Sequence, residues 1–390
     1  MKRLLLLLFI LFIPFTVKAA NARPVDIHGN LNVQGTNIVD KNGNVFQLRG
    51  VSTHGIGWFP QYVNQDAFNY MRDEWGINAI RLAMYSDPNC NRNEQTYELV
   101  KKGVEYAKNA GLYVIIDWHI LNDSNPNIYK SDAIDFFKKM ANLYKDYPNV
   151  LYEICNEPNG NVTWDRDIKP YALDVIKEIR EIDKDAIIII GTPTWSQDVD
   201  IVSKDPIKQY NNLVYALHFY AGDHKDNIRN KMNTAINNGL PILVSEFGLV
   251  KADGNGSIDE VSSKKWFELL DENKTGYFMW NLSNKNEGSA MIKSNVTKTS
   301  GWTYDELSDH GKYFYNKLKT YPEEVEEITT STTIESSTIP KVEEVTINED
   351  ILKEEPNTII KIVLGLITGI LMIIAIIAII KTNINKNSNN

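Results

Sequence analysis

The sequence predicts an α/β fold, a (β/α)8 barrel, and two observations lead to this fold class. Short and almost wholly apolar runs alternate with stretches that are apolar at helical spacing, which is typical of parallel strands covered by helices. Eight such runs occur in about 280 residues, the number and size expected of a barrel of this type. A doubly wound open sheet is the alternative, but no glycine-rich phosphate loop follows the first run.

The eight predicted strands are short runs rich in β-branched and aromatic side chains. In chain order they cover residues 45–52, 78–84, 112–118, 150–155, 186–190, 214–219, 241–247 and 276–282. Upstream, residues 31–48 predict a hairpin that turns at Asn42-Gly43. We expect this hairpin to cover the N-terminal end of the barrel.

Two connecting segments have clear helix signals. Residues 97–111 are apolar at helical spacing and end at Gly111, a residue type common directly after helix ends. Residues 131–148 predict a second helix, with Ser131 as its N-cap and Pro148 as its stop.

Residues 1–20 predict a secretory signal peptide rather than a part of the fold. They have a basic start, an apolar core and small residues at the end, and we expect cleavage near Ala19 or Ala20. Residues 321–358 predict a disordered linker, because they contain 11 acidic residues, two lysines and many Ser and Thr, but almost no aromatic side chains.

Residues 359–381 predict a transmembrane helix. Within them, residues 362–380 form an uncharged apolar run, which at about 1.5 Å per residue reaches about 28 Å, enough to cross a hydrocarbon core of about 30 Å. A buried core helix is the alternative, but it would need charged or polar positions on one face. Lysines in and before the tail 382–390 predict a cytoplasmic end. Together with the leader, this span predicts a protein anchored on the extracellular face of the cell membrane.

The charge balance and the cysteine content restrict the partners and the chemistry. Residues 21–320 hold 33 basic and 39 acidic side chains, and an acidic domain repels phosphate, so a nucleic-acid partner is disfavoured. Cys90 and Cys155 are the two cysteines, so no disulfide framework stabilises the chain. Spacing does not decide whether they pair, but Cys155 lies in an apolar strand and is expected to be a core residue. We expect a monomer.

Acidic residues stand at the ends of two predicted strands. Glu157 follows residues 150–155, and Glu246 lies at the end of residues 241–247. Because the C-terminal ends of barrel strands converge on one face, both carboxyl groups are expected to face one pocket. Other side chains expected at this face are Arg81, His119, His218, Tyr220, Trp280, His54 and Trp58.

Two carboxyl groups in one cleft, without a cluster of metal ligands, fit glycoside hydrolysis best. Glu157, partly desolvated, is predicted to have a raised pKa and to donate a proton, while Glu246 stays ionised as the nucleophile beside Arg81. Asn156 is placed to bind the sugar 2-hydroxyl. His119 and His218 are expected to orient these groups.

Aromatic side chains at the same face suit sugar rings, whose C–H faces stack on indoles and phenols. Trp58, Trp195 and Trp280 are predicted there, together with a charged pair, Lys285 and Glu287. Taken singly, each of these residues has a structural explanation. A strand-end Glu is more often a cap, a buried Arg an ion-pair partner, a buried His a satisfied core imidazole, and a Trp a core residue.

The chain resembles family 5 glycoside hydrolases, and more narrowly the bacterial endo-β-1,4-glucanases typical of bacilli and clostridia (subfamily 2). The segments that carry the resemblance are GINAIRLAMY, LYVIIDWHILNDSNPNIYK, YPNVLYEICNEPNG, TPTWSQDV, YALHFYAG and PILVSEFG. The similarity runs from about Gly29 to Leu318, and we place the barrel domain at residues 29–320.

The resemblance implies a retaining mechanism without cofactor or metal, on cellulose and related β-glucans. It places Glu157 as general acid/base and Glu246 as nucleophile. The remaining active-site positions fall on Arg81, His119, Asn156, His218, Tyr220 and Trp280, and the glucose subsites on His54, Trp58, Tyr85, Trp195, Lys285 and Glu287. The chain departs from close relatives at Phe247, where they often carry tryptophan, and this change is expected to affect packing rather than chemistry.

Two alternatives stay open at this level. The enzyme could prefer mannan, mixed-linkage glucan or xyloglucan, because loop contacts rather than motifs decide specificity. It could also be a catalytically silent glycan-binding surface protein, although such a protein would tolerate the loss of either acid, and both are present.

Overall fold

The structure is a computed structural model that describes residues 23–322. The predicted signal peptide (1–20), the linker (321–358) after its first two residues, the transmembrane helix (359–381) and the tail (382–390) lie outside the described residues. Among residues 23–322, none of the helices has the length and apolar character needed to cross a membrane.

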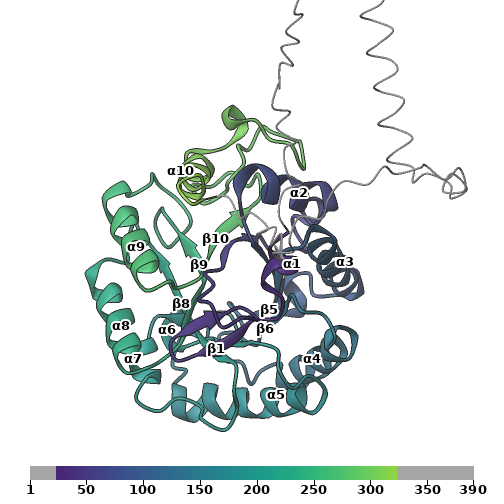
Figure 1. Cartoon of the computed structure of the whole chain (residues 1–390), viewed down its shortest axis with the longest axis vertical. Coiled ribbons are helices and arrows are strands. Elements are labelled where there is room, and N and C mark those ends of the chain that lie inside the picture. Colours follow the sequence, from purple (N-terminus) through teal and green to yellow (C-terminus); the bar gives the residue numbers. More distant parts are fainter. Residues whose placement is uncertain (1–22, 323–390) are drawn as a thin grey trace, which may run out of the picture. The chain divides into compact units, whose positions relative to one another are not determined.

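Eight parallel strands form a closed barrel, which confirms the predicted (β/α)8 fold (Figure 1). Around the barrel the strand order is β10-β3-β4-β5-β6-β7-β8-β9, so neighbours in the chain are neighbours in the barrel and the last strand closes onto the first. The strands are β3 (Arg49–Thr53), β4 (Ala79–Tyr85), β5 (Tyr113–His119), β6 (Val150–Glu153), β7 (Ile188–Ile190), β8 (Leu213–Tyr220), β9 (Ile242–Gly248) and β10 (Tyr277–Leu282).

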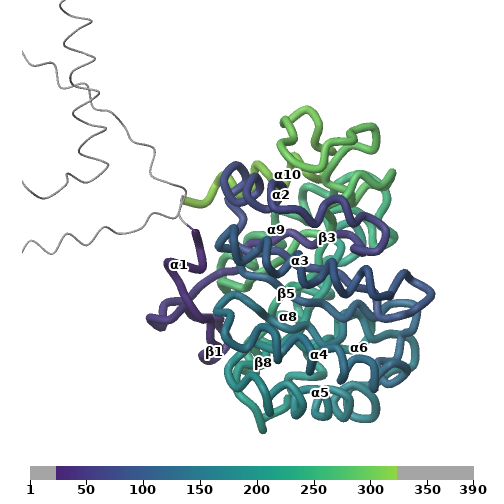
Figure 2. The backbone as a smooth tube through the Cα atoms, turned by 90° about the vertical axis from the view of Figure 1, so that its right-hand side faces the viewer, coloured from purple at the N-terminus to yellow at the C-terminus, as the bar shows by residue number. Residues whose placement is uncertain are grey.

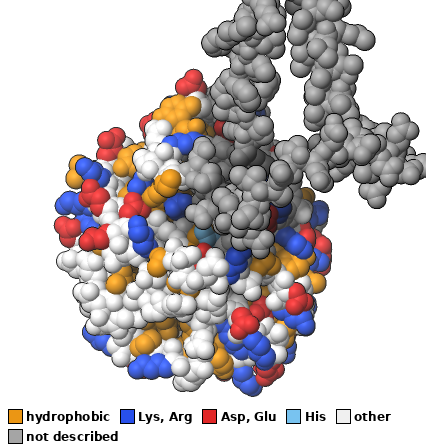
Figure 3. All heavy atoms as spheres, viewed as in Figure 1, with side chains coloured by type: hydrophobic (Ala, Val, Ile, Leu, Met, Phe, Trp, Pro, Cys, Tyr) orange, Lys and Arg blue, Asp and Glu red, His pale blue; other side chains and the backbone are white. Residues whose placement is uncertain are grey.

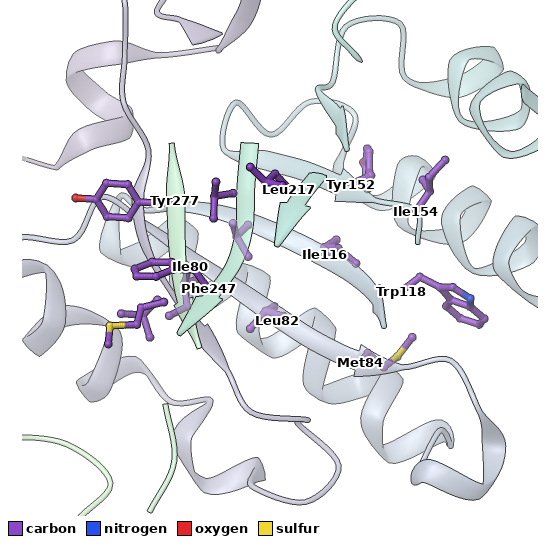
Figure 4. Packing of buried hydrophobic residues seen from close by; sticks show 14 of the residues in the cluster. Ile80, Leu82, Met84, Ile116, Trp118, Tyr152, Ile154, Leu217, Phe247 and Tyr277 are labelled. Atoms are coloured by element: carbon purple, nitrogen blue, oxygen red, sulfur yellow. The ribbon is translucent and has the colours of Figure 1, made fainter. Parts of the chain in front are cut away.

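Helices surround the barrel and cover the outward faces of its strands (Figure 1). The main helices are α2 (Gln65–Tyr70), α3 (Glu94–Ala110), α4 (Lys130–Tyr144), α5 (Lys169–Ile182), α7 (Val199–Val202), α8 (Asp226–Asn237), α9 (Glu260–Glu272) and α10 (Asp309–Leu318). Outward-facing side chains such as Ile80, Leu82 and Ile116 belong to one large buried cluster (Figure 4). Burial of this kind is worth about 25 cal/mol per Å² and holds the helices on the sheet.

Phe247, the predicted departure from close relatives, lies in this buried cluster between the strands and the helices. It is fully buried, and its ring contacts the rings of Phe219, Phe267, Tyr277 and Phe314. Its side chain therefore packs behind the barrel wall and away from the cavity described below.

Helix α3 follows its sequence signals, whereas the start of α4 does not. Gly111 ends α3 in the left-handed conformation, at φ +68°. Ser131 is not the N-cap of α4 but lies inside the helix, so that prediction is wrong. The first turn closes two positions earlier than an N-cap at Ser131 would allow, because the N-cap is Tyr129 and the amide of Ala133 donates to its carbonyl. The helix ends at Tyr144, before Pro148.

The N-terminal segment closes the end of the barrel where the strands begin. After α1 (Pro24–His28), strands β1 (Asn32–Gln34) and β2 (Asn37–Val39) form a hairpin at this end of the barrel, at the left in Figure 2. Leu31, Ile38 and Phe46 pack against the inward-facing side chains of the strand starts. The predicted cover is therefore confirmed.

The predicted turn at Asn42-Gly43 is present and is closed by the antiparallel bridge between Val39 and Val45, but an additional turn precedes it. The paired strands turn at Gly35-Thr36, and Asn42-Gly43 forms a second turn in which the amide of Gly43 donates to the carbonyl of Asp40. Residues 45–48, predicted as the start of the first barrel strand, belong instead to this cover, and β3 begins at Arg49. The apolar side chains of Phe46 and Leu48 are buried there, which explains why the run resembles a strand.

Both cysteines are free, which answers the question that their spacing left open. Cys155 is fully buried in the core, as predicted, and Cys90 is partly exposed.

The interior of the barrel changes from apolar to polar along its axis. Near the strand starts it is filled by Ile115, Leu151, Val214 and other apolar side chains. Toward the strand ends, the inward side chains become Ser52, Arg81, Asp117, Glu153 and Ser245, all fully buried. On the outer surface at the end where the strands begin, which carries α1 and β1, basic and acidic side chains intermix around the rim (Figure 3).

Candidate active site

A cavity of about 1000 Å³ opens where the barrel strands end. Most of the residues predicted for the site line this cavity. They are His54, Trp58, Tyr85, His119, Glu157, Trp195, His218, Tyr220, Glu246, Trp280, Lys285 and Glu287. The other two, Arg81 and Asn156, are fully buried and contact these lining residues from below.

Glu157 reaches the cavity because the chain continues alongside β5 after β6 ends. The amide of Asn156 donates to the carbonyl of Trp118, and the amide of Glu157 donates to the carbonyl of Ile120. Pro158 follows and has no amide hydrogen with which to extend this pairing. The carboxyl group is thus held at the rim with 8% of the residue exposed.

Glu246 faces the cavity because of an irregularity in β9. Between the pairs Ala216–Leu243 and His218–Glu246, strand β9 advances three residues while β8 advances two. Such a β-bulge lets consecutive side chains point to the same face. Ser245 and Glu246 therefore both point into the barrel, and each contacts partners there.

The two predicted catalytic carboxyl groups lie close together. Glu157, His218 and Glu246 each offer one oxygen or nitrogen atom within 4.8 Å of the others. The two acids nevertheless have different partners. Arg81 Nη1 donates to one oxygen of Glu246 at 3.1 Å, and the Tyr220 hydroxyl donates to the other at 2.8 Å. Charge-assisted hydrogen bonds of this kind stabilise the carboxylate form.

Arg81 connects this carboxylate to two further acids. Its guanidinium contacts Glu153 at 2.7 Å, Asp117 at 2.9 Å and the Asn156 side-chain oxygen at 2.6 Å. Burial opposes its charge, but Asp117, Glu153 and Glu246 raise the pKa of Arg81, so it stays charged. Burial also opposes the charge of Glu153 and by itself would raise the pKa of this acid, but Arg81 and His218 lower it to about 2. For Asp117 burial dominates and raises the pKa well above its ordinary value.

His119 is a neutral ring. Its pKa falls to about 3, because burial disfavours the charged form and Arg81 lies nearby. Nδ1 contacts Asp117 at 2.7 Å, and Nε2 lies 3.3 Å from the side-chain nitrogen of Asn156. In the neutral tautomer that fits both, Nδ1 donates to Asp117 and Nε2 accepts from Asn156. The ring also stacks on Trp280, with centroids 5.3 Å apart.

His218 is a charged ring. Burial opposes its charge, but hydrogen bonds to neighbouring acids raise its pKa to about 9. Nδ1 donates to Glu157 at 2.9 Å, and Nε2 donates to the Ser245 hydroxyl at 2.9 Å. A ring that donates from both nitrogens has no lone pair for a metal ion. The group of Glu157, His218 and Glu246 therefore fits acid/base chemistry better than cation binding.

Two exposed tryptophans stand beside the carboxyl groups. Trp58 is 41% exposed and packs edge-on against Tyr85, with centroids 4.5 Å apart. Trp195 is 44% exposed. Lys285 and Glu287 form the predicted charged pair at 2.6 Å, and His54 lies 3.4 Å from Lys285 Nζ. Burial, and then the charge of Lys285, lower the pKa of His54 to about 4.

The turn that presents Trp195 has an unusual backbone. Thr194, Trp195 and Ser196 have φ values of +56°, +54° and +55°, a left-handed conformation disfavoured for residues with a Cβ. Hydrogen bonds hold this turn against the strain. The Ser196 hydroxyl donates to the carbonyl of Asn156 at 2.6 Å, and the Trp195 amide donates to the carbonyl of Pro158 at 3.0 Å.

Three buried residues of the site were missed in the sequence: Asp117, Glu153 and Ser245. For the two acids a signal existed, since a charged residue inside an apolar strand, two positions from His119 or four from Glu157, is anomalous on its own. Ser245 had no such signal, because regular alternation would have placed it and Glu246 on opposite faces. Gln197, His224 and Asp253 also line the cavity without having been predicted.

Comparisons with known proteins agree with this geometry. Residues 39–286 match the family described as cellulase (glycosyl hydrolase family 5). The chain is 45% identical over 306 residues to endoglucanase A of Butyrivibrio fibrisolvens, covering 76% of this chain and 70% of that protein. It is 43% identical over 311 residues to endoglucanase N of Pectobacterium atrosepticum, covering 80% and 70%.

Solved structures are similar as well. Cellulase Cel5C_n superposes with a TM-score of 0.72 at 40% identity, covering 77% of this chain and 94% of that one. The catalytic domain of Thermobifida fusca endoglucanase Cel5A, solved in complex with cellotetraose, has a TM-score of 0.72 at 34% identity, covering 76% of this chain and 100% of that one.

Proposed function

The chain belongs to the cellulase family of glycosyl hydrolases, family 5, and from this premise we propose that it is a retaining endo-1,4-β-glucanase that hydrolyses internal β-1,4-glucosidic bonds of cellulose and related β-glucans. One observation carries the proposal. Glu157 and Glu246 offer oxygen atoms within 4.8 Å of each other in one cavity, each with its own set of partners. The two named relatives are endoglucanases, and the Thermobifida fusca structure contains cellotetraose.

Retention is supported by the distance between the two acids. Retaining enzymes hold their carboxyl groups about 5–5.5 Å apart, whereas inverting enzymes need about 6.5–9.5 Å to admit a water molecule. In the first step, a Glu246 oxygen bonds to the anomeric carbon while Glu157 gives its proton to the departing glycosidic oxygen. In the second, Glu157 takes a proton from water, and the hydroxide displaces Glu246.

The surroundings of Glu246 support its role as nucleophile. Arg81 and Tyr220 donate to both of its oxygens, which fixes the carboxylate plane and leaves lone pairs toward the cavity. When the ester forms, the charge on Glu246 disappears, and Glu153 and Asp117 remain as partners for Arg81. The buried arginine therefore keeps compensating charge through both steps.

Glu157 and His218 form a hydrogen-bonded pair that shares one proton. Their contact of 2.9 Å means that the acid and the ring compete for one proton. That Glu157 itself holds this proton when substrate is bound stays a prediction. Asn156 is held by Arg81 and by the carbonyl of Ile120, and its binding of the sugar 2-hydroxyl stays a prediction.

An internal cut is supported by the two exposed tryptophans. Trp58 and Trp195 line the same cavity as the acids. Sugar rings stack on such platforms, so several glucose units of one chain would be held beside the scissile bond.

The direct test is product analysis with the purified protein. Carboxymethylcellulose, barley mixed-linkage glucan, xyloglucan and mannan are offered in parallel, and NMR follows the anomeric form of the first product. We expect fastest cleavage of a β-1,4-glucan, a rapid fall in viscosity, and β-configured product before mutarotation. An initially α-configured product would contradict retention. A silent glycan-binding protein would bind these polymers and cleave none.

We also infer a location on the extracellular face of the cell membrane, which rests on the predicted leader and span. The last described residues lie at the end of the barrel opposite the cavity. The Tyr321 hydroxyl contacts Tyr277 and Asp271, and Arg49 lies over its ring, at the end of the barrel where strands begin. Comparing activity on intact cells with activity in the medium, for the full chain and for a chain ending at Pro322, tests this. If the full chain and the shortened chain released equal activity into the medium, the predicted membrane anchor would be contradicted.

A further inference from the structure

A continuous chain of buried hydrogen bonds connects the two carboxyl groups of the site. From His218 Nε2 it runs to the Ser245 hydroxyl at 2.9 Å and on to Glu153 Oε1 at 2.6 Å. The other oxygen of Glu153 accepts from Arg81 Nε at 2.7 Å, and Arg81 Nη1 reaches Glu246. Ser245 and Glu153 are fully buried and do not line the cavity, so neither touches substrate.

Glu153 sets the direction of these hydrogen bonds. Burial opposes its ionisation, yet Arg81 and His218 bring the pKa of Glu153 to about 2, so it is a carboxylate that only accepts. A hydroxyl has one hydrogen to donate, and that of Ser245 is engaged by Glu153 at 2.6 Å. The lone pairs of Ser245 therefore face His218, and Nε2 of the ring must carry a hydrogen.

This direction decides which proton states the His218–Glu157 pair can adopt. With a hydrogen held on Nε2, the ring can be charged and donate from Nδ1 to a Glu157 carboxylate. Alternatively it can be neutral, and Nδ1 then accepts from the carboxylic acid of Glu157. The second state is the one that a proton donor requires. A neutral ring with its hydrogen on Nδ1 would instead need Glu157 without its proton.

We propose that Ser245 and Glu153 are positioning residues that hold a hydrogen on Nε2 of His218, so that the proton needed by the leaving group stays within the Glu157–His218 pair. This inference rests on the proposed function, because it takes Glu157 as the general acid. Both residues act through His218 and not on the sugar. The β-bulge supplies the geometry, since it turns Ser245 and Glu246 inward together.

Other charged and titratable groups also surround the ring of His218. They are Glu157 and Glu153 from β6 and the residues after it, Glu246 from β9, and Asp117 and His119 from β5. Arg81 from β4 contacts Glu153, and Tyr220, on β8 like His218, contacts Glu246. Replacing Ser245 leaves all of these in place. A changed pH profile of kcat/KM in that variant therefore reports on the loss of the Ser245 hydroxyl itself.

The test compares two aryl β-cellobiosides in the full chain and its Ser245→Ala variant. A phenyl leaving group needs the acid's proton, whereas a 2,4-dinitrophenyl leaving group departs without it. We expect kcat/KM on the phenyl substrate to fall by about tenfold, a fraction of the effect of a whole general acid, and its alkaline limb to move to lower pH. On the dinitrophenyl substrate, kcat/KM should stay within about twofold, since proton donation contributes little there.

Three further variants complete the design. Ser245→Thr keeps a hydroxyl and should restore the phenyl activity and its pH profile. Ser263→Ala removes another fully buried serine, on α9 and away from the cavity, and should leave kcat/KM on both substrates unchanged. Glu153→Gln can turn an amide nitrogen toward Ser245 and so reverse the hydrogen bonds, and it should lower the phenyl activity selectively.

The outcomes separate cleanly. An equal loss on both substrates in Ser245→Ala, or an unchanged phenyl pH profile in both Ser245→Ala and Glu153→Gln, would overturn the inference while wild-type hydrolysis still supported the proposed function. If the wild type cleaved neither the cellobiosides nor any β-glucan, the proposed function would fail, and the inference with it.

Discussion

Arg81 shows how one side chain can hold the charges of a whole site. It is fully buried, and three acids, Asp117, Glu153 and Glu246, lie within 3.1 Å of its guanidinium nitrogens. A lysine could not replace it, because a single ammonium cannot donate in three directions within one plane. The arginine therefore serves stability and catalysis at the same time.

Arg81→Met should lower both. Removing one partner leaves buried carboxylates uncompensated, which costs about 3–5 kcal/mol, and the loss of the hydrogen bond to Glu246 should reduce kcat as well. Urea unfolding and turnover of carboxymethylcellulose measure the two effects. The control is Arg166→Met, because the Arg166 side chain is largely exposed and its ion pair with Asp167 should be worth less than about 1 kcal/mol. Similar losses in the two variants would contradict the buried network.

His218 should make stability depend on pH at alkaline values. The unfolded ring loses its proton near its ordinary pKa of 6.5, whereas the folded ring keeps it to about pH 9. Stabilisation by this group is thus complete below pH 6.5 and is lost as pH rises toward 9. In that window one proton corresponds to about 1.4 kcal/mol of unfolding free energy per pH unit.

Urea unfolding between pH 6.5 and 9 measures this decline, and His218→Gln is the comparison. The variant should be less stable at pH 6.5 and should show a shallower decline. The same slope in both proteins would mean that another group carries the proton.

Catalytic roles separate Glu157 from Glu246. Glu246→Ala should lose activity by about 10⁴-fold or more on every glycoside, because no covalent intermediate can form. Glu157→Ala should keep much of its first-step rate on a dinitrophenyl glycoside, which needs no proton. Added azide should then give a β-glycosyl azide with Glu157→Ala and an α-glycosyl azide with Glu246→Ala. Reversed anomers would exchange the two roles.

At the scale of elements, the turn 194–196 places an aromatic platform by means of backbone strain. Three consecutive residues with a Cβ adopt a left-handed conformation that costs about 1–2 kcal/mol each. Hydrogen bonds to the segment of Asn156 and Pro158 offset this strain. The turn that carries Trp195 is thereby fixed directly to the strand end that carries Glu157.

Trp195→Ala and Trp195→Gly form a matched pair for this turn. Both remove the ring, so both should raise KM for a soluble β-glucan by up to about tenfold, the value of one stacking contact. Glycine accepts φ near +54° without strain, so the Gly variant should be about 1 kcal/mol more stable than the Ala variant. Differential urea unfolding decides the second point. An Ala variant as stable as the Gly variant would argue against strain at this position.

The N-terminal cover is an element of stability and not of catalysis. Phe46 contacts Tyr113 and His28 at the end of the barrel opposite the cavity. Phe46→Ala should cost about 3–5 kcal/mol, whereas Phe46→Leu, which nearly conserves volume, should cost less than about 1.5 kcal/mol. Both variants should keep the wild-type kcat. A changed kcat in the folded Leu variant would contradict this division of roles.

At the scale of the molecule, every residue assigned to the site lies between His54 and Glu287. A chain ending at Pro322 should therefore match the full chain in kcat/KM on a soluble oligosaccharide. A chain ending at Thr320 also loses Tyr321 and leaves the buried Tyr277 hydroxyl without its partner, which should cost about 1–3 kcal/mol. Thermal unfolding of the two truncated chains makes the comparison, and equal stability would place the domain boundary earlier.

Much of this molecule follows from local pattern. The apolar runs at residues 112–118 and 214–219 predict their strands to within a residue or two, since a strand covered on both faces must be apolar along its length. The placing of Glu157 and Glu246 at strand ends predicts that they meet, because all eight strands of a parallel barrel end at one face. Both predictions depend only on the order of residues along a strand.

Only the tertiary structure decided which neighbours surround the two acids. Ser245 and Glu246 share a face because β9 slips by one residue against β8, and this register arises from contacts between strands that no local pattern records. Likewise, the grouping of Asp117 and Glu153 around Arg81, and the left-handed turn at Trp195, depend on residues distant in the chain. Local sequence therefore determined the strands and the placing of the two acids at strand ends, while long-range packing determined the proton and charge network between them.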